Sequence, residues 1–178
     1  MATYERADTE TVDLVLERIE TFYPQLYRAE VRVDVMMAFG RRRGGELVSA
    51  AIMHRGYPAA GTMRIIGLRD RAAGRGDAEM LIDGDHWAGM GLAARTALVD
   101  HELHHLMLVW EDEEREVPKA DDCGRPRLKL RKHDFEIGGF HEIAKRHKAH
   151  APEVRAVGKA FEGVEVAQLY LPGMGVAA

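Results

Sequence analysis

The sequence predicts an α+β fold, with helices near both ends and in the middle of the chain and short strands between them. Two observations support this prediction. Apolar residues recur with helical spacing in three separate stretches. In other stretches apolar and polar residues alternate, as they do along half-buried strands. No internal repeat or low-complexity block interrupts the pattern, so we expect one domain over residues 1–170 and a flexible tail over residues 171–178.

The first half of the chain is expected to hold one helix followed by strands. Helical spacing predicts a helix over residues 10–28, although Pro24 weakens the prediction near its end. Alternation then predicts a strand over residues 31–37. Further short apolar segments bounded by Gly, Pro or Asp predict strands over residues 47–53, 62–68 and 78–83.

In the second half, the apolar period changes from that of strands to that of helices. A long, well-buried helix is predicted over residues 91–110, and the acidic segment 111–116 is expected to end it. Residues 127–132 alternate basic and apolar side chains, which is typical of an edge strand. Helical spacing returns over residues 135–150.

Composition excludes several classes of protein. The 178 residues are 46% hydrophobic and 30% charged, which is too apolar for a disordered chain. The net charge of −4 excludes a globally basic nucleic-acid binder. The single cysteine, Cys123, excludes an intrachain disulfide framework and a cysteine-rich zinc ribbon, and we assign it no role. No apolar run has the length of a membrane span and the N-terminus lacks the apolar core of a secretory signal, so we expect a cytoplasmic protein without membrane association.

The residues with the clearest chemistry lie within the predicted central helix. His101, Glu102 and His105 form the pattern H-E-x-x-H. Residues four apart lie on one face of a helix, so both imidazoles can reach one metal ion. Glu102 would lie beside the ion and could take a proton from water, while a zinc ion with three protein ligands keeps its fourth position for that water. The alternative is a helix whose polar residues face solvent and bind no metal.

A zinc site needs a third ligand, and the sequence offers several. His133 is our preferred candidate, because it lies at the junction between the basic strand and the last helix. Glu136 is its rival, and Asp134 could orient a ligand imidazole instead. We interpret His104 as a packing or supporting residue rather than a ligand. The remaining candidates are His141 and Glu142.

Several segments together resemble a family of phage metallopeptidases with a zincin-like fold. The matching segments are RGYPAA (55–60), DAEMLID (77–83) with Trp87, LVDHELHHL (98–106), and KLRKHDFEIGGF (129–140) with Arg146 and His147. The resemblance implies that His101, His105 and His133 bind zinc and that Glu102 is the general base. The His133–Asp134 pair is similar to the place where this family and the related SprT-like proteases supply the last ligand.

The resemblance also implies an architecture. An N-terminal helix and a small mixed sheet would precede the motif helix, and a C-terminal helix would close the site. In zincin-like folds an edge strand beside the motif helix holds an extended peptide by strand addition. Residues 78–83 are our candidate for that strand.

The main hypothesis is therefore a zinc peptidase, encoded by a phage or prophage, that acts on proteins or peptides. His104, Tyr57 and His141 are candidates for stabilising the oxyanion. A second hypothesis is a zinc hydrolase acting on cell-wall peptides or nucleic acid. A third is a metal-stabilised nucleic-acid or protein-binding module, for which the turn 41–43 and a basic strand would contact phosphates. The basic residues of that strand region are Arg125, Arg127, Lys129, Arg131 and Lys132.

Overall fold

The computed structural model describes residues 2–54, 56–133, 141–150, 154–155 and 157–158. The chain divides into two compact units, Met1–Lys132 and His133–Ala178. The predicted tail over residues 171–178 lies outside the described residues. The expectation of a single domain over residues 1–170 stays a prediction.

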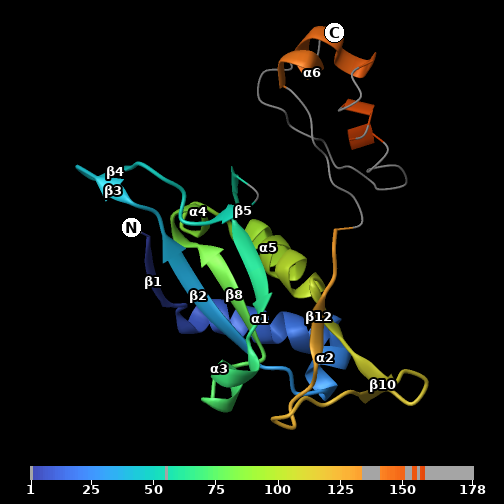
Figure 1. Ribbon diagram of the computed structural model, residues 1–178. Coiled ribbons are helices and arrows are strands. Elements are labelled where there is room, and N and C mark those ends of the chain that lie inside the picture. Colours follow the sequence, from blue (N-terminus) through green and yellow to red (C-terminus); the bar gives the residue numbers. More distant parts are fainter. Residues whose placement is uncertain (1, 55, 134–140, 151–153, 156, 159–178) are drawn as a thin grey trace. The chain divides into compact units, whose positions relative to one another are not determined.

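A small mixed sheet forms the centre of the first unit (Figure 1). Its strands, in spatial order, are β1 (Thr3–Arg6), β2 (Val33–Phe39), β8 (Ala78–Asp83) and β7 (Gly61–Ile65). β2 and β8 are parallel, whereas β1 and β7 pair antiparallel with their neighbours. The predicted α+β class with a small mixed sheet is therefore confirmed.

Helices α1 (Thr9–Phe22) and α5 (Leu92–His104) pack against this sheet and bury its core (Figure 1). α1 begins at Asp8, whose carboxylate accepts a hydrogen bond from the backbone N–H of Thr11. Both helices and β8 contribute fully buried side chains to the core, among them Val15, Met80, Ile82, Val99 and Leu103. Burial of this apolar face is the main source of stability for the unit that carries the motif.

The predicted helix over residues 10–28 divides in two at Tyr23. α2 (Pro24–Arg28) begins at the proline, which has no backbone N–H to continue the hydrogen bonds of α1. Two other short helices are α3 (Leu68–Ala72) and α4 (Gly84–Trp87). In the second unit, α6 spans His141–His147 and a 3-10 turn spans Lys148–His150. The first part of the predicted helix 135–150 lies outside the described residues.

The predicted central helix over residues 91–110 is too long, because α5 ends at His104. The chain continues as β9 (Leu106–Leu108), which pairs antiparallel with β12 (Leu128–Leu130). Leu106 and Leu108 are buried on one side of β9, so an apolar run that fits a helix is satisfied by a strand instead. β10 (Trp110–Asp112) and β11 (Val117–Pro118) then form a hairpin across the predicted acidic turn.

The predicted strand over residues 47–53 is also wrong. Two short hairpins take its place, β3 (Arg42–Arg43) with β4 (Glu46–Leu47) and β5 (Met53–His54) with β6 (Tyr57–Pro58). Gly44 and Gly45 adopt positive φ angles in the first turn, which glycine does without steric cost. The side chains of Leu47 and Met53 are exposed, so these residues have no buried face that would extend a strand.

The strand proposed for peptide binding, residues 78–83, is not at an edge. β8 lies between β2 and β7 and is almost fully buried, as its apolar composition allows. β7 is the edge strand on this side of the sheet. In the described part of the chain, none of the helices is both long and apolar enough to cross a bilayer.

Candidate metal centre

The H-E-x-x-H residues lie at the C-terminal end of α5. His101 and Glu102 belong to its last turn, and His105 follows it with a helical backbone (φ −67°, ψ −24°). The helical spacing therefore continues through the motif even though the helix ends there. The imidazole rings of His101 and His105 have centroids 5.1 Å apart, so both can approach a common point.

The pairing of β9 with β12 brings the residues after β12 close to the H-E-x-x-H motif. Leu106 lies opposite Leu130, and the backbone N–H of Arg131 donates to the carbonyl of His105 at 2.7 Å. His133 follows two residues later. Each of His101, His105 and His133 offers one ring nitrogen, and these atoms lie within 4.8 Å of one another.

The donor set of this group fits a zinc ion. Zn–N bonds of about 2.0–2.1 Å place tetrahedral nitrogen ligands roughly 3.3 Å apart, so small side-chain adjustments bring the three nitrogens to that spacing. The Nδ1 of His105 lies 2.8 Å from the backbone carbonyl of Arg131. A carbonyl can only accept, so Nδ1 carries the proton and the lone pair of neutral His105 is on Nε2, as a metal ligand requires.

Glu102 lies beside this group in an environment that disfavours its charge. Its side chain is 3% exposed, and Oε2 has no hydrogen-bond partner among the described residues. Burial raises the pKa of Glu102 to about 7, although the nearby His105 favours the charged form. A carboxyl group with this pKa can gain and lose a proton near neutral pH.

Gly61, at the start of the edge strand β7, lets this strand approach Glu102 closely. A Cβ atom on Gly61 would lie 3.0 Å from Oε1 of Glu102, which is closer than ordinary contact. The buried carboxylate therefore lies directly against the first residue of β7. The sequence does not mark Gly61 as part of the site, since a glycine before a strand is also a common turn residue.

The other residues that the sequence singled out are not part of the group of three histidines. Arg131 donates to Nε2 of His104, and the His104 ring makes an edge contact with Tyr23. Tyr57 lies on β6 and is 76% exposed. Asp134 and Glu136 lie outside the described residues, and His141 and Glu142 belong to α6 in the second unit.

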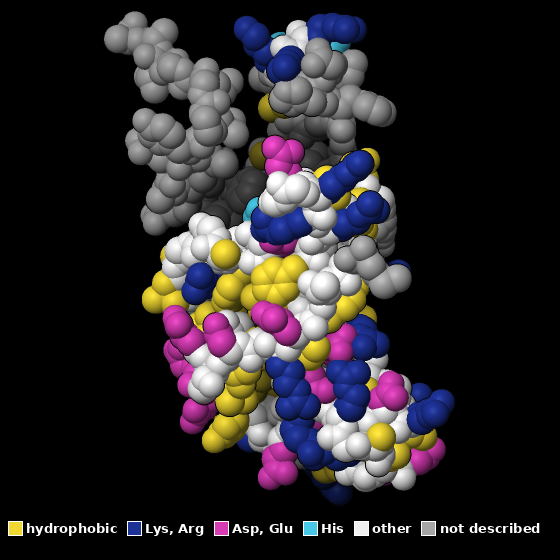
Figure 2. Space-filling model, turned by 90° about the vertical axis from the view of Figure 1, so that its left-hand side faces the viewer, with side chains coloured by type: hydrophobic (Ala, Val, Ile, Leu, Met, Phe, Trp, Pro, Cys, Tyr) yellow, Lys and Arg dark blue, Asp and Glu magenta, His cyan; other side chains and the backbone are white. Residues whose placement is uncertain are grey.

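Part of the basic surface considered for phosphate binding is engaged in ion pairs. Arg125 Nη2 lies 2.6 Å from Oδ2 of the buried Asp77, and Arg71 pairs with the same carboxylate. In the turn 41–43, Arg42 pairs with Asp85. On the face drawn in Figure 2, Lys and Arg side chains lie interspersed with Asp and Glu side chains. These observations weaken the case for a nucleic-acid surface.

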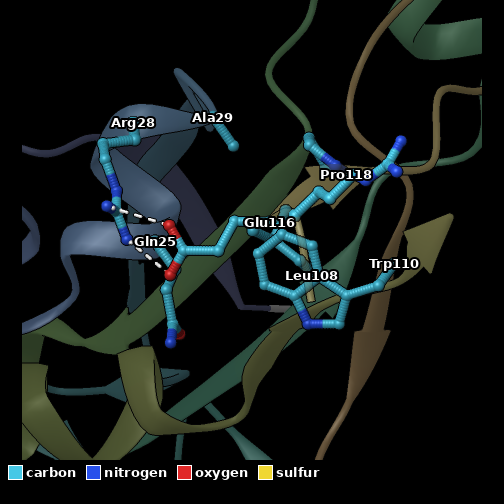
Figure 3. A pocket seen from close by; sticks show the side chains of 8 residues that line it. Gln25, Arg28, Ala29, Leu108, Trp110, Glu116 and Pro118 are labelled. Carbon is cyan, nitrogen blue, oxygen red and sulfur yellow. Dashed lines mark hydrogen bonds and ion pairs between the residues drawn. The ribbon is translucent and has the colours of Figure 1, made fainter. Parts of the chain in front are cut away.

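A separate pocket of about 190 Å³ lies between α2, β9 and the β10–β11 hairpin (Figure 3). Leu108, Trp110 and Pro118 line its apolar part. Its two arginines are paired with carboxylates, Arg28 with Glu116 and Arg115 with Asp112. The lining contains no histidine or cysteine, so the candidate metal ligands lie elsewhere.

One motif histidine lies in the last turn of α5 and the second directly after it, with a third histidine and a buried glutamate beside them. This arrangement defines a candidate metal-dependent hydrolase. A family model described as "Putative phage metallopeptidase" matches residues 2–162, which is most of the chain. The chain therefore belongs to this family, as its sequence motifs predict. Comparisons with curated proteins and with solved structures gave no significant match.

Proposed function

We propose that this protein is a zinc-dependent metallopeptidase, encoded by a phage or prophage, that hydrolyses peptide bonds in proteins or peptides. His101, His105 and His133 would hold the zinc ion, and Glu102 would act as the general base. The observation that carries the proposal is the approach of three histidine nitrogens to within 4.8 Å, beside a buried carboxyl group. Membership of the family supports it.

When bound, zinc would supply a Lewis acid that polarises a carbonyl group and acidifies water. Glu102 would take the proton from the attacking water and pass it to the leaving amine. Its pKa of about 7 suits both roles, because neither protonation state is strongly favoured at neutral pH. The hydrogen bond from Nδ1 of His105 to Arg131 would keep the ring in the orientation and tautomer that a ligand needs.

The edge of β7 offers main-chain groups for an extended peptide. The N–H of Asp83 donates to the carbonyl of Ala60, and the N–H of Ile66 donates to the carbonyl of Asp77. With the register of the two strands, the even-numbered residues of β7 are therefore the ones whose backbone groups bond to β8. In an antiparallel pair these alternate with residues whose groups face outward. The N–H and C=O groups of Gly61 and Met63 therefore face away from β8. We propose that a substrate adds to this edge as another strand, which replaces our expectation for residues 78–83.

The proposal is tested by comparing the wild type with Glu102→Gln on unfolded casein and on purified murein. We expect the wild type to cleave casein. The variant should keep its zinc and lose at least 1,000-fold in rate, in the range for loss of a positioned general base and of the water it orients. An active Glu102→Gln variant would contradict the mechanism. Cleavage of murein alone would instead favour a cell-wall hydrolase, and steeply salt-dependent DNA binding without hydrolysis would favour a binding module.

A further inference from the structure

Two residues of the N-terminal region form hydrogen bonds with the last turns of the motif helix. The guanidinium of Arg18 donates two hydrogen bonds to Asp100, with Nε to Oδ1 at 2.8 Å and Nη2 to Oδ2 at 2.6 Å. The hydroxyl of Tyr23 donates to the backbone carbonyl of the same aspartate at 2.7 Å. Asp100 directly precedes His101, so both contacts act on the turn that carries the motif.

The break between α1 and α2 places Tyr23 for this contact. Pro24 begins α2, and Tyr23 leaves the helical conformation with φ −125° and ψ 57°. Its backbone N–H still donates to Ile19, which ties it to the end of α1. Burial raises the pKa of Tyr23 above its usual value, so the hydroxyl keeps its proton and remains a donor near neutral pH.

Further contacts link Tyr23 through His104 to Arg131, the residue that follows β12. The Tyr23 ring meets His104 edge-on, with centroids 6.4 Å apart. Arg131 donates to His104 with its side chain and accepts from Nδ1 of His105 with its backbone carbonyl. Together these residues form one connected set of contacts around the last turn of α5: Arg18, Tyr23, Asp100, His104 and Arg131.

These contacts bear on the spacing of the two motif histidines. Helix ends fray, because their last carbonyl groups lack partners within the helix. His101 and His105 span the end of α5, and the separation of their rings depends on that turn staying helical. Residues that fix the turn therefore fix the spacing of two candidate ligands before a metal arrives.

We propose that Arg18 and Tyr23 are positioning residues of the metal centre, which hold the last turn of α5 so that His101 and His105 are spaced to share one ion. This inference rests on the proposed function. Neither residue is a ligand or touches the reacting atoms in this account. They act through Asp100 and His104, and they lower the reorganisation that metal binding requires.

The test is the zinc affinity of Tyr23→Phe, measured by competition with a chromophoric chelator on the full chain. The variant removes only the hydroxyl that donates to Asp100. Tyr27→Phe is the matched control, because Tyr27 lies on α2 and is exposed. We expect the zinc Kd to rise about 10-fold in Tyr23→Phe, as for loss of groups that support metal ligands, and to change less than 2-fold in Tyr27→Phe.

Arg18→Lys gives a second, independent variant, which keeps the positive charge and loses the bidentate hydrogen bonding to Asp100. It should also weaken zinc binding several-fold. With cobalt in place of zinc, both variants should change the visible absorption bands of the bound ion, whereas Tyr27→Phe should not. A general loss of stability would lower the melting temperature of the metal-free protein without altering these bands.

Unchanged zinc affinity and unchanged cobalt spectra in Tyr23→Phe and Arg18→Lys would overturn the inference, even if the melting temperature fell. In that case the wild type would still bind zinc and the proposed function would stand. A wild type that binds neither ion would remove the proposed function and this inference together. The two failures are therefore distinguishable in one series of measurements.

Discussion

Replacing Glu102 by Gln should stabilise the metal-free protein at alkaline pH. Burial raises the pKa of Glu102 in the folded state to about 7, against an ordinary value of 4.5. The folded chain therefore holds a proton that the unfolded chain releases between these values. Stability from this group is greatest below pH 4.5 and is lost as the pH rises through 7.

The size of the effect follows from the two pKa values. A difference of about 2.5 units corresponds to about 3 kcal/mol, at 1.36 kcal/mol for each unit. Glutamine has the same shape and no charge to bury, so it avoids this cost. Part of this cost is already present at pH 5. Relative to the wild type, the free energy of unfolding of Glu102→Gln should therefore rise by about 2–3 kcal/mol between pH 5 and pH 8.

The assay is urea unfolding of both proteins at pH 5 and pH 8 after removal of metal with a chelator. Glu46→Gln on the exposed strand β4 is the matched control and should follow the wild type at both pH values. A difference between Glu102→Gln and the wild type that does not change with pH would refute the reasoning. It would mean that Glu102 titrates in the folded chain as it does in water.

Two further predictions test neighbouring parts of the structure. Gly61→Ala should lower peptidase activity about 10-fold with zinc retained, because its Cβ would displace the Glu102 carboxylate by a few tenths of an ångström. Measurements of rate and of metal content on the same samples check this. An unchanged rate would contradict the proposed placement of Glu102 against β7. Asp77→Asn should lower the free energy of unfolding by about 3–5 kcal/mol, because it leaves the buried charge of Arg71 poorly paired. Urea unfolding measures the loss, and a change under 1 kcal/mol would show that Asp121 suffices as the partner of Arg71.

Much of the sheet could be predicted from the sequence. Alternation of side-chain types marked β2 and β12, and short apolar segments marked β7 and β8. The order of the strands could not be predicted, because a fully apolar strand fits an interior position and a covered edge equally well. This is why β8 was expected at the edge, where the structure has β7.

The end of the motif helix shows a second limit. Leu106 and Met107 fit the helical pattern of the residues before them, whereas Leu106 and Leu108 also fit the alternation of a strand. Only the pairing of β9 with β12, some twenty residues further along the chain, decides between the two. Local sequence carries no information about that partner.

The candidate site was predictable in part. The spacing of His101 and His105 follows from helix geometry alone, and the sequence singled out His133 as the preferred third ligand. That choice stays a prediction, as does the role of Glu102. The contacts of Arg18 and Tyr23 with Asp100 join residues about 80 positions apart, and an arginine or tyrosine on a helix gives no sign of such a partner.

The central claim is that three histidines bind one zinc ion, and the metal content of the purified protein tests it most directly. Mass spectrometry of the wild type should find about one zinc per chain, and His101→Ala and His133→Ala should each lose it. Zinc that persists in His133→Ala and disappears in His101→Ala would move the third ligand to Glu136. A wild type that takes up no zinc when the ion is supplied would contradict the account.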